Sequence, residues 1–345
     1  MWFTSDNAAG AAPGVLEAMA AANDGPAMAY GADAMTVRAR DLVREILGAP
    51  KAAVHFVATG TAANALALAT LTPPWGAVWC HDHAHIEEDE CGAPEFFTGG
   101  AKLVKVAGPD GKMDTAALGA AIGAAGGAVH HVQKGALSLT QATEAGTVYT
   151  ATELSALAGA AKAAGAPVHL DGTRFANALV ATGASPAQMS HEAGVDILCL
   201  GFTKNGAPAA EAVAIFDDRL AWEFELRRKR GGHLFSKMRF VAAQVAALLD
   251  DDYWLRLAAH ANRMAAGLAA GLSTTSGVKI LHPVEANLIF AEIPRAAHEA
   301  LRARGAAYYD WPGEAGPEHV TIRLVASHAT REDEVTNFLD ALKAG

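Results

Sequence analysis

The stretch His169-Leu170-Asp171-Gly172-Thr173-Arg174 ends an apolar segment that begins at Pro167. The next apolar segment, Ile197–Leu200, leads in the same way to a charged residue, Lys204. Short apolar runs separated by longer Ala-rich helical patterns are typical of parallel strands in an α/β domain. Ligands gather at the carboxyl ends of such strands, so we expect Asp171 and Lys204 to project into one crevice.

The same alternation of apolar runs and helical patterns extends from about residue 51 to residue 216. Strands are expected at seven places: Ala53–Val57, Ala77–Cys80, Leu103–Val106, Val129–Val132, Pro167–Leu170, Ile197–Leu200 and Ala212–Phe216. Helices are expected at Met35–Leu47, Thr61–Leu71, Thr115–Ala124 and Ala151–Ala164. We therefore predict a large α/β domain with a mostly parallel sheet of seven strands.

A different pattern follows the long helices that begin near residue 217. Strands are expected near Val278–Leu281, Asn287–Glu292 and Val320–Val325, with helices near Arg295–Arg304 and Arg331–Leu342. This order indicates a small α+β domain. A chain of 345 residues exceeds the usual size of one compact core, so we expect two domains. They span residues 1–250, an N-terminal arm with the large domain, and residues 251–345, the small C-terminal domain.

The charge and composition exclude several classes of protein. A net charge of −10 would repel a polyanion, and the dense basic block is short, so no nucleic acid partner is expected. No apolar run reaches the roughly 18 residues of a membrane span and the first residues lack a signal sequence, so we expect a cytoplasmic protein without a membrane partner. Cys80, Cys91 and Cys199 are far apart, which predicts no thiolate metal site.

A third element stands between the expected strand Ala53–Val57 and the helix that follows it. Thr59-Gly60-Thr61 would place backbone N–H groups and a positive helix end where a phosphate can bind. Each feature alone has a simpler explanation: a helix cap here, and solvated turns at Asp171 and Lys204. Together they match the chemistry of pyridoxal phosphate (PLP), which needs a lysine for a Schiff base and a carboxylate to keep the pyridine nitrogen protonated.

The three motifs, taken in order, are also familiar as a set. Gly60-Thr61-Ala62-Ala63-Asn64, the stretch from His169 to Arg174, and Thr203-Lys204-Asn205-Gly206 resemble low-specificity L-threonine aldolases, a branch of the fold-type I PLP enzymes. The resemblance extends over nearly the whole chain, and its further motifs are Thr4-Ser5-Asp6-Asn7, Ala29-Tyr30-Gly31-Ala32-Asp33, Gly231-Gly232-His233, Lys237-Met238-Arg239 and Ile322-Arg323-Leu324-Val325.

The resemblance implies an activity and an assembly. Members of the family use PLP to cleave L-threonine, L-allo-threonine and other 3-hydroxy-L-amino acids, phenylserine among the candidates, to glycine and an aldehyde. It implies a homodimer or homotetramer with active sites at the subunit interface. The basic block Arg227–Arg230 then falls beside an interface loop, and a plain exposed charge cluster is the alternative.

Roles for single residues follow from the resemblance as well. On the cofactor side Gly60 and Thr61 would bind the phosphate, Asp171 would hold the pyridine nitrogen, and Lys204 would form the Schiff base. On the substrate side the expected residues are Arg174, which would contact the phenolic oxygen or the substrate, and Ser5 with Arg323, which would bind the carboxylate. The planar guanidinium of arginine suits a carboxylate because it can bind both oxygens at once.

The segment from His81 to Glu90 is rich in groups that bind metals or move protons. A metal site and a solvated loop are both compatible with alternating His and acidic residues. The family pattern of a His five residues before a Glu fits His85 and Glu90, with His83 as the second choice. His85 would then stack on the pyridine ring and is the first candidate for the base that takes the β-hydroxyl proton, and no metal is expected.

One segment departs from the family pattern. Where relatives often read Ser-Leu-Glu-Asn-Thr-His-Asn-Gly, this chain reads Ser138-Leu139-Thr140-Gln141-Ala142-Thr143-Glu144-Ala145-Gly146, without the His. The threo versus allo preference and the aldehyde-side pocket therefore stay open. A β-eliminating lyase or aminotransferase on the same fold, and a protein that binds PLP without turnover, are the alternatives to an aldolase.

Overall fold

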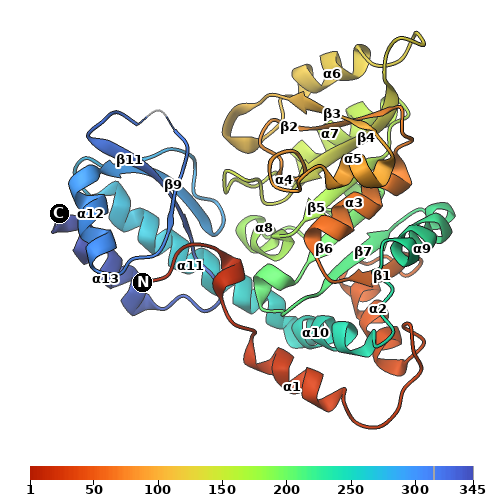
Figure 1. Cartoon of the computed structure of the whole chain (residues 1–345), viewed down its shortest axis with the longest axis horizontal. Coiled ribbons are helices and arrows are strands. Elements are labelled where there is room, and N and C mark those ends of the chain that lie inside the picture. Colours follow the sequence, from red (N-terminus) through yellow and green to blue (C-terminus); the bar gives the residue numbers. More distant parts are fainter. Residues whose placement is uncertain (314, 345) are drawn as a thin grey trace.

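The computed structural model of the chain describes residues 1–313 and 315–344 and shows a large and a small domain (Figure 1). Glu314 and Gly345, the last residue of the predicted small domain, lie outside the described residues. The large sheet has seven strands in the order β1 (Ala53–Val57), β7 (Glu211–Ile215), β6 (Ile197–Gly201), β5 (Val168–Gly172), β4 (Gln133–Thr140), β2 (Gly76–His81) and β3 (Lys102–Val106). All neighbours are parallel except β7, which is antiparallel to both β1 and β6. The predicted seven-stranded, mostly parallel sheet is confirmed.

Strand β4 lies where the sequence analysis did not place it. The expected strand Val129–Val132 is wrong, because this segment forms a turn in which Val129 is 91% exposed. The strand begins at Gln133 instead and buries Ser138 in its middle. A serine weakens the apolar signal, yet here its Oγ lies 2.9 Å from Nδ1 of His169 on the neighbouring strand, which satisfies it. The segment that differs from the family pattern, residues 138–146, therefore begins within β4 and continues past its carboxyl end.

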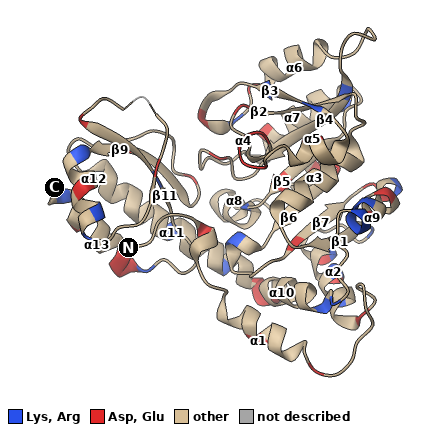
Figure 2. Cartoon of the chain, viewed as in Figure 1, with Lys and Arg blue, Asp and Glu red and all other residues tan. Residues whose placement is uncertain are grey.

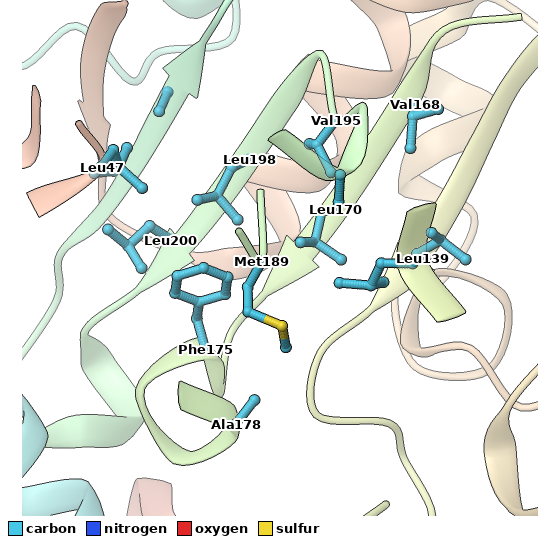
Figure 3. Close-up of a cluster of buried hydrophobic side chains, with 14 of the residues drawn as sticks. Leu47, Leu139, Val168, Leu170, Phe175, Ala178, Met189, Val195, Leu198 and Leu200 are labelled. Atoms are coloured by element: carbon cyan, nitrogen blue, oxygen red, sulfur yellow. The ribbon is translucent and has the colours of Figure 1, made fainter. Parts of the chain in front are cut away.

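Helices cover both faces of the large sheet, which gives three layers (Figure 1). Because the strands are buried on both sides, alternate residues serve opposite cores. Ile197 packs with Phe224 on one face, whereas Leu198 lies on the other with Phe175 and Met189 (Figure 3). The helices of this domain are α1 (Pro13–Ala21), α2 (Ala34–Ile46), α3 (Gly60–Leu71), α4 (His85–Glu88), α5 (Ala93–Thr98), α6 (Thr115–Gly123), α7 (Ala151–Ala163), α8 (Phe175–Thr182), α9 (Ala221–Arg230) and α10 (Arg239–Leu249).

The small domain is an antiparallel sheet with helices on its outer side (Figure 1). Its strands lie in the order β10 (Tyr309–Asp310), β11 (His319–Val325), β9 (Leu288–Pro294) and β8 (Lys279–Ile280). Ile322 and Leu324 of β11 pack with the helices α11 (Tyr253–Ser273), α12 (Arg295–Ala303) and α13 (Glu332–Lys343). Since side chains alternate along a strand, Thr321 and Arg323 of β11 share the opposite face.

Two segments join the domains. Helix α11 begins in the core of the large domain, where Trp254 is buried, and continues into the core of the small domain. At the other end of the chain, the backbone N–H of Phe3 donates to the carbonyl of Ala307 (2.7 Å), and the N–H of Val325 donates to the carbonyl of Phe3 (2.9 Å). The boundary near residue 250 stays a prediction, and the first residues pack with the small domain. Among the described helices, none is both long and apolar enough to cross a membrane.

Candidate active site

A cavity of about 380 Å³ lies at the carboxyl ends of the large-domain strands. Its walls bring together four of the predicted site residues, which are Gly60, Thr61, His85 and Lys204. Other residues of the wall had no role assigned from the sequence: Asn7, Asn64, Glu90, Thr173, Thr203 and Glu211. A cavity is therefore present at the ends of the strands with Lys204 in its wall, whereas Asp171 lies behind the wall and is bound by the lining residues Asn64 and Thr173.

The first turn of α3 forms one wall of this cavity. Thr59 caps the helix, since its Oγ1 accepts a hydrogen bond from the N–H of Ala62 at 3.2 Å. The N–H groups of Gly60 and Thr61 precede the first intrahelical hydrogen bond, which joins Ala63 to Thr59. These donors and the positive end of the helix suit an anion.

Asp171 is buried at the end of β5 and is held from both sides. Its Oδ1 accepts hydrogen bonds from the N–H of Thr173 (3.0 Å) and from its hydroxyl (2.6 Å), and its Oδ2 accepts one from Asn64 (2.9 Å). Burial alone would raise the pKa of Asp171, but the nearby charge of His85 and the donors of Thr173 outweigh it and lower the pKa. The carboxylate therefore stays ionised in a fixed orientation.

His85 is joined to the same network through Glu90. Glu90 Oε1 lies 2.9 Å from His85 Nδ1 and 2.9 Å from Asn64 Nδ2. Burial lowers the pKa of His85, but the hydrogen bond with Glu90 and the charges of Glu144 and Asp171 outweigh it, so the net pKa is raised. His83, the second choice, pairs instead with Glu88 (2.8 Å) and lines a neighbouring cavity. His85 is thus the histidine that borders Lys204.

Lys204 sits in a short turn directly after β6. Asn205, the next residue, donates to the carbonyl of Trp254 at 2.8 Å and so anchors this turn to α11. Glu211 lies close by with its Oε2 accepting a hydrogen bond from the N–H of Phe202 (2.9 Å), and burial raises its pKa to about 7. Because β7 is antiparallel to β6, its first residue, Glu211, lies at the edge of the sheet where β6 ends. Glu211 precedes its strand, so the rule that site residues follow strands does not predict it.

Arg174 contacts the N-terminal segment. Its Nε and Nη2 donate to the two carboxylate oxygens of Asp6 at 2.7 and 3.0 Å, and Asn287 of the small domain adds a third hydrogen bond to Asp6 at 3.1 Å. Burial opposes ionisation of Asp6, but Arg174 and Lys204 outweigh it and lower its pKa to about 2. Asp6 belongs to the motif around Ser5, yet nothing in the sequence indicated that it pairs with a residue so distant in the chain.

The two residues expected at the substrate carboxylate differ in their surroundings. Ser5 Oγ accepts a hydrogen bond from the N–H of Asn7 at 3.1 Å. Arg323 Nε is buried and has no hydrogen-bond partner in residues 1–313 and 315–344. Burial and the nearby Arg174 both lower the pKa of Arg323. A buried N–H donor without a partner is costly unless a bound anion accepts its hydrogen bond.

The segment that lacks the family's His is tightly folded. Gln141 and Tyr149 exchange hydrogen bonds at 2.7 and 3.0 Å, and the hydroxyls of Thr143 and Thr147 lie 2.7 Å apart. Thr143 is buried in these contacts. The next residue, Glu144, brings its charge close enough to affect the pKa values of His85, Arg174 and Arg323. This carboxylate lines a second cavity, together with His83.

Comparison with known proteins agrees with this geometry. The model of the beta-eliminating lyase family matches residues 3–296. The low specificity L-threonine aldolase of Pseudomonas aeruginosa is 46% identical over 91% of this chain and 90% of its own length, and that of another Pseudomonas strain is 40% identical over 99% and 97%.

Solved structures extend the comparison to the fold. A threonine aldolase of Leishmania major is 31% identical, has a TM-score of 0.94, and the match covers 99% of this chain and 98% of that one. A more distant structure of SPT with PLP, 15% identical and with a TM-score of 0.70, covers 100% of this chain and 86% of that one and shares the fold.

Proposed function

This chain belongs to the low-specificity L-threonine aldolases of the beta-eliminating lyase family, and from that premise we propose how its residues act in the reaction. It is a carbon–carbon lyase that releases glycine and an aldehyde. We propose that its substrates are L-threonine, L-allo-threonine and other 3-hydroxy-L-amino acids, phenylserine included. The observation that carries this proposal is the convergence of Lys204, the first turn of α3 and the network around Asp171 on one cavity.

PLP is the cofactor that the family implies, and the cavity fits it. The free N–H groups of Gly60 and Thr61 suit its phosphate, and Lys204 offers an amine for covalent attachment. The ionised carboxylate of Asp171 suits a protonated ring nitrogen. Asn64 Oδ1 is buried without a partner among the described residues, as expected of a wall that a bound group completes. When bound, PLP supplies an electron-withdrawing ring that takes up the electron pair of the broken Cα–Cβ bond.

We propose that Arg323 and Ser5 bind the substrate carboxylate. The unused Nε of Arg323 supplies one donor, and the hydroxyl of Ser5, which here lies 3.4 Å from Asp6 Oδ1, can rotate to supply another. The proposed contact of Arg174 with the cofactor's phenolic oxygen or the substrate rests on the family resemblance. Its hydrogen bonds to Asp6 also support Ser5, the neighbour of Asp6, in its position.

His85 is the proposed base for the β-hydroxyl proton. With Glu90 Oε1 at 2.9 Å, Nδ1 is the nitrogen that holds a proton, and Nε2 is left to accept one. The raised pKa of His85 favours a residue that both takes and returns protons. Transfer of the hydroxyl proton to Nε2 lets the Cα–Cβ bond break and the aldehyde leave, and a proton added at Cα completes glycine.

The experiment that tests this function is an assay of products from threonine, allo-threonine and phenylserine with the PLP-loaded enzyme. We expect equal amounts of glycine and aldehyde, acetaldehyde from the first two substrates and benzaldehyde from the third. Ammonia with a 2-oxo acid would indicate β-elimination, and transfer of the amino group would indicate an aminotransferase. A loaded protein that forms no product from any of the three would overturn the proposal.

We also propose that the protein assembles as a homodimer or homotetramer through the surface between α5 and α9. Phe96 of α5 is 79% exposed and Leu226 of α9 is 52% exposed, and both line one surface groove. The basic block Arg227–Arg230 ends α9, which carries blue segments in Figure 2, and Arg227 and Arg230 line the groove. Exposed aromatic groups with nearby arginines are characteristic of protein interfaces. Analytical ultracentrifugation of the wild type and of Phe96→Ser tests this interface. The variant is expected to dissociate into monomers at a higher protein concentration than the wild type does.

A further inference from the structure

A second cavity, of about 330 Å³, lies between the two domains next to the active site. The large domain contributes Glu144 and the histidines of the segment before α4. The small domain contributes Leu281, Phe290, Trp311 and Thr321. None of the steps described above uses this space, although Trp311 in its wall lies close to the guanidinium of Arg323.

The wall formed by the small domain carries two aromatic side chains held by the pairing of its strands. Phe290 lies directly opposite Arg323 in the pairing of β9 with β11, and the N–H of Trp311 donates to the carbonyl of Thr321 at 2.9 Å. The rings of Phe290 and Trp311 meet edge to face, with centres 5.4 Å apart. Such a pair offers a further ring both a flat face and a complementary edge.

Three observations join this cavity to the reacting part of the substrate. Thr321 lines the cavity and stands two residues before Arg323, so both side chains share one face of β11. The guanidinium of Arg323 lies 5.0 Å from the ring centre of Trp311. Glu144 lines the cavity and also affects the pKa values of His85 and Arg323. A substrate whose carboxylate is bound by Arg323 therefore has this cavity within reach of its Cβ substituent.

The charges of the cavity favour an uncharged occupant. Glu88 is paired with His83 at 2.8 Å, and Asp110 is paired with His282 at 2.9 Å. Glu144 forms no hydrogen bond through its side chain within the described part of the chain, so its charge is open to the cavity. An anionic substituent would be repelled here, whereas a hydroxyl or amide could donate to this carboxylate.

We propose that this cavity is the subsite for the β-substituent of the substrate, and that it selects neutral aromatic 3-hydroxy-amino acids over those with an anionic ring. The aromatic wall of Phe290 and Trp311 binds the ring, and Glu144 excludes the negative charge. The proposal rests on the aldolase function argued above and names the substrate class of the same site.

The first test replaces the aromatic wall. Trp311→Ala is expected to lower the ratio of kcat/KM for phenylserine to kcat/KM for threonine by about 10- to 30-fold, and Trp311→Phe is expected to restore most of it. Tyr309→Ala is the matched control, because the ring of Tyr309 also lies near Arg323, at 6.0 Å, without lining the cavity. If Trp311→Ala fails to fold, Leu281→Trp, which fills the cavity, should lower the same ratio. An unchanged ratio in the folded variants, or an equal change with Tyr309→Ala, overturns the subsite.

The second test concerns the charge. The wild type is expected to cleave phenylserine at least about tenfold more efficiently than 4-carboxyphenylserine, and Glu144→Gln should remove most of this difference. A ratio between these two ring substrates that does not change in the variant refutes the role of Glu144. Release of acetaldehyde from threonine by the wild type distinguishes the two proposals. If no acetaldehyde is released, the aldolase function is refuted; if it is released, the two tests above bear on the subsite alone.

Discussion

The two sides of the active-site crevice are built in different ways. On the large-domain side, Asn64 donates to both Asp171 and Glu90, and both oxygens of Asp171 accept hydrogen bonds. On the small-domain side, the buried Nε of Arg323 and the hydroxyl of Thr321 have no partner among the described residues. The side facing the proposed cofactor therefore holds its carboxylates with its own donors and leaves acceptors such as Asn64 Oδ1 unpaired among the described residues, whereas the side facing the substrate leaves donors unpaired.

The change with the largest expected effect removes the amine of Lys204. Lys204→Ala should abolish covalent attachment of PLP and lower turnover by several orders of magnitude, because no other lysine lines the cavity in the described chain. Reduction with borohydride followed by peptide mass mapping measures the attachment. A labelled peptide from another part of the variant would show that the large-domain side of the crevice has been assigned to the wrong residues.

The next change leaves the shape of the large-domain side and removes its charge. Asp171→Asn should retain the fold and lower kcat by about 10²- to 10³-fold, since a neutral amide cannot stabilise a protonated ring nitrogen. Steady-state kinetics of the PLP-loaded variant measure the loss, and circular dichroism checks the fold. Turnover close to that of the wild type would contradict the proposed role of the carboxylate.

On the substrate side, Arg323→Ala should separate binding of substrate from binding of cofactor. Losing a charged, two-pronged contact in a shielded site costs about 2–5 kcal/mol, which corresponds to roughly 30- to several-thousand-fold in kcat/KM. PLP should still bind covalently, because Arg323 is not part of the network around Asp171. Titration with glycine, which binds without being cleaved, tests the contact directly, and an affinity equal to that of the wild type would refute it.

The link between the two sides can be tested through stability. The pKa of Asp6, about 2 in the folded protein against an ordinary 3.8, contributes about 2 kcal/mol at neutral pH. Because the folded pKa is lowered, this contribution is present above pH 4 and is lost as the pH falls towards 2. Asp6→Asn should therefore be less stable than the wild type at pH 7 by about 2–4 kcal/mol, since Arg174 is left buried without its partner.

Urea unfolding of both proteins between pH 7 and pH 3 measures this difference. The gap in free energy of unfolding should narrow as the pH falls below 4. A gap that stays constant over this range would mean that the ion pair of Asp6 with Arg174 does not stabilise the junction of the domains.

The smallest expected effect belongs to Ser5. Ser5→Ala removes one hydroxyl donor from the proposed carboxylate site and the acceptor for the N–H of Asn7, and should raise KM about 3- to 10-fold with little change in kcat. Initial-rate kinetics with threonine measure the split. A fall in kcat at unchanged KM would assign Ser5 to the chemical step instead of to substrate binding.

Much of the fold could be predicted because its signals are local. The strand Ala53–Val57 and the starts and ends of the surrounding helices follow from apolar periodicity and from caps such as Thr59. Asp171 and Lys204 could be brought together because parallel strands end at one edge. Strand β4 was misplaced because the buried Ser138 interrupts the apolar run and is satisfied only by His169 on another strand.

The rest of the candidate site depends on contacts between distant parts of the chain. Asp6 contacts Arg174 of the large domain and Asn287 of the small domain, and no spacing in the sequence indicates contacts between residues so far apart. Glu211 was missed because one antiparallel strand reverses the rule that polar site residues follow strands. Family resemblance supplied Arg323 and Ser5, whereas the sequence alone gave no reason to prefer them over exposed polar residues.

The N-terminal segment has a consequence for protein engineering. Phe3 is fully buried in the small domain, where its ring lies 5.3 Å from that of Phe338, while Asp6 is bound by Arg174 of the large domain. In a chimera that exchanges only residues 251–344 with a homologue, Phe3 would pack against the core of another protein. Asp6 would also lose its hydrogen bond from the native Asn287. The unit that can be exchanged intact is discontinuous: the first six residues must travel with the C-terminal part, although some 240 positions of sequence lie between them.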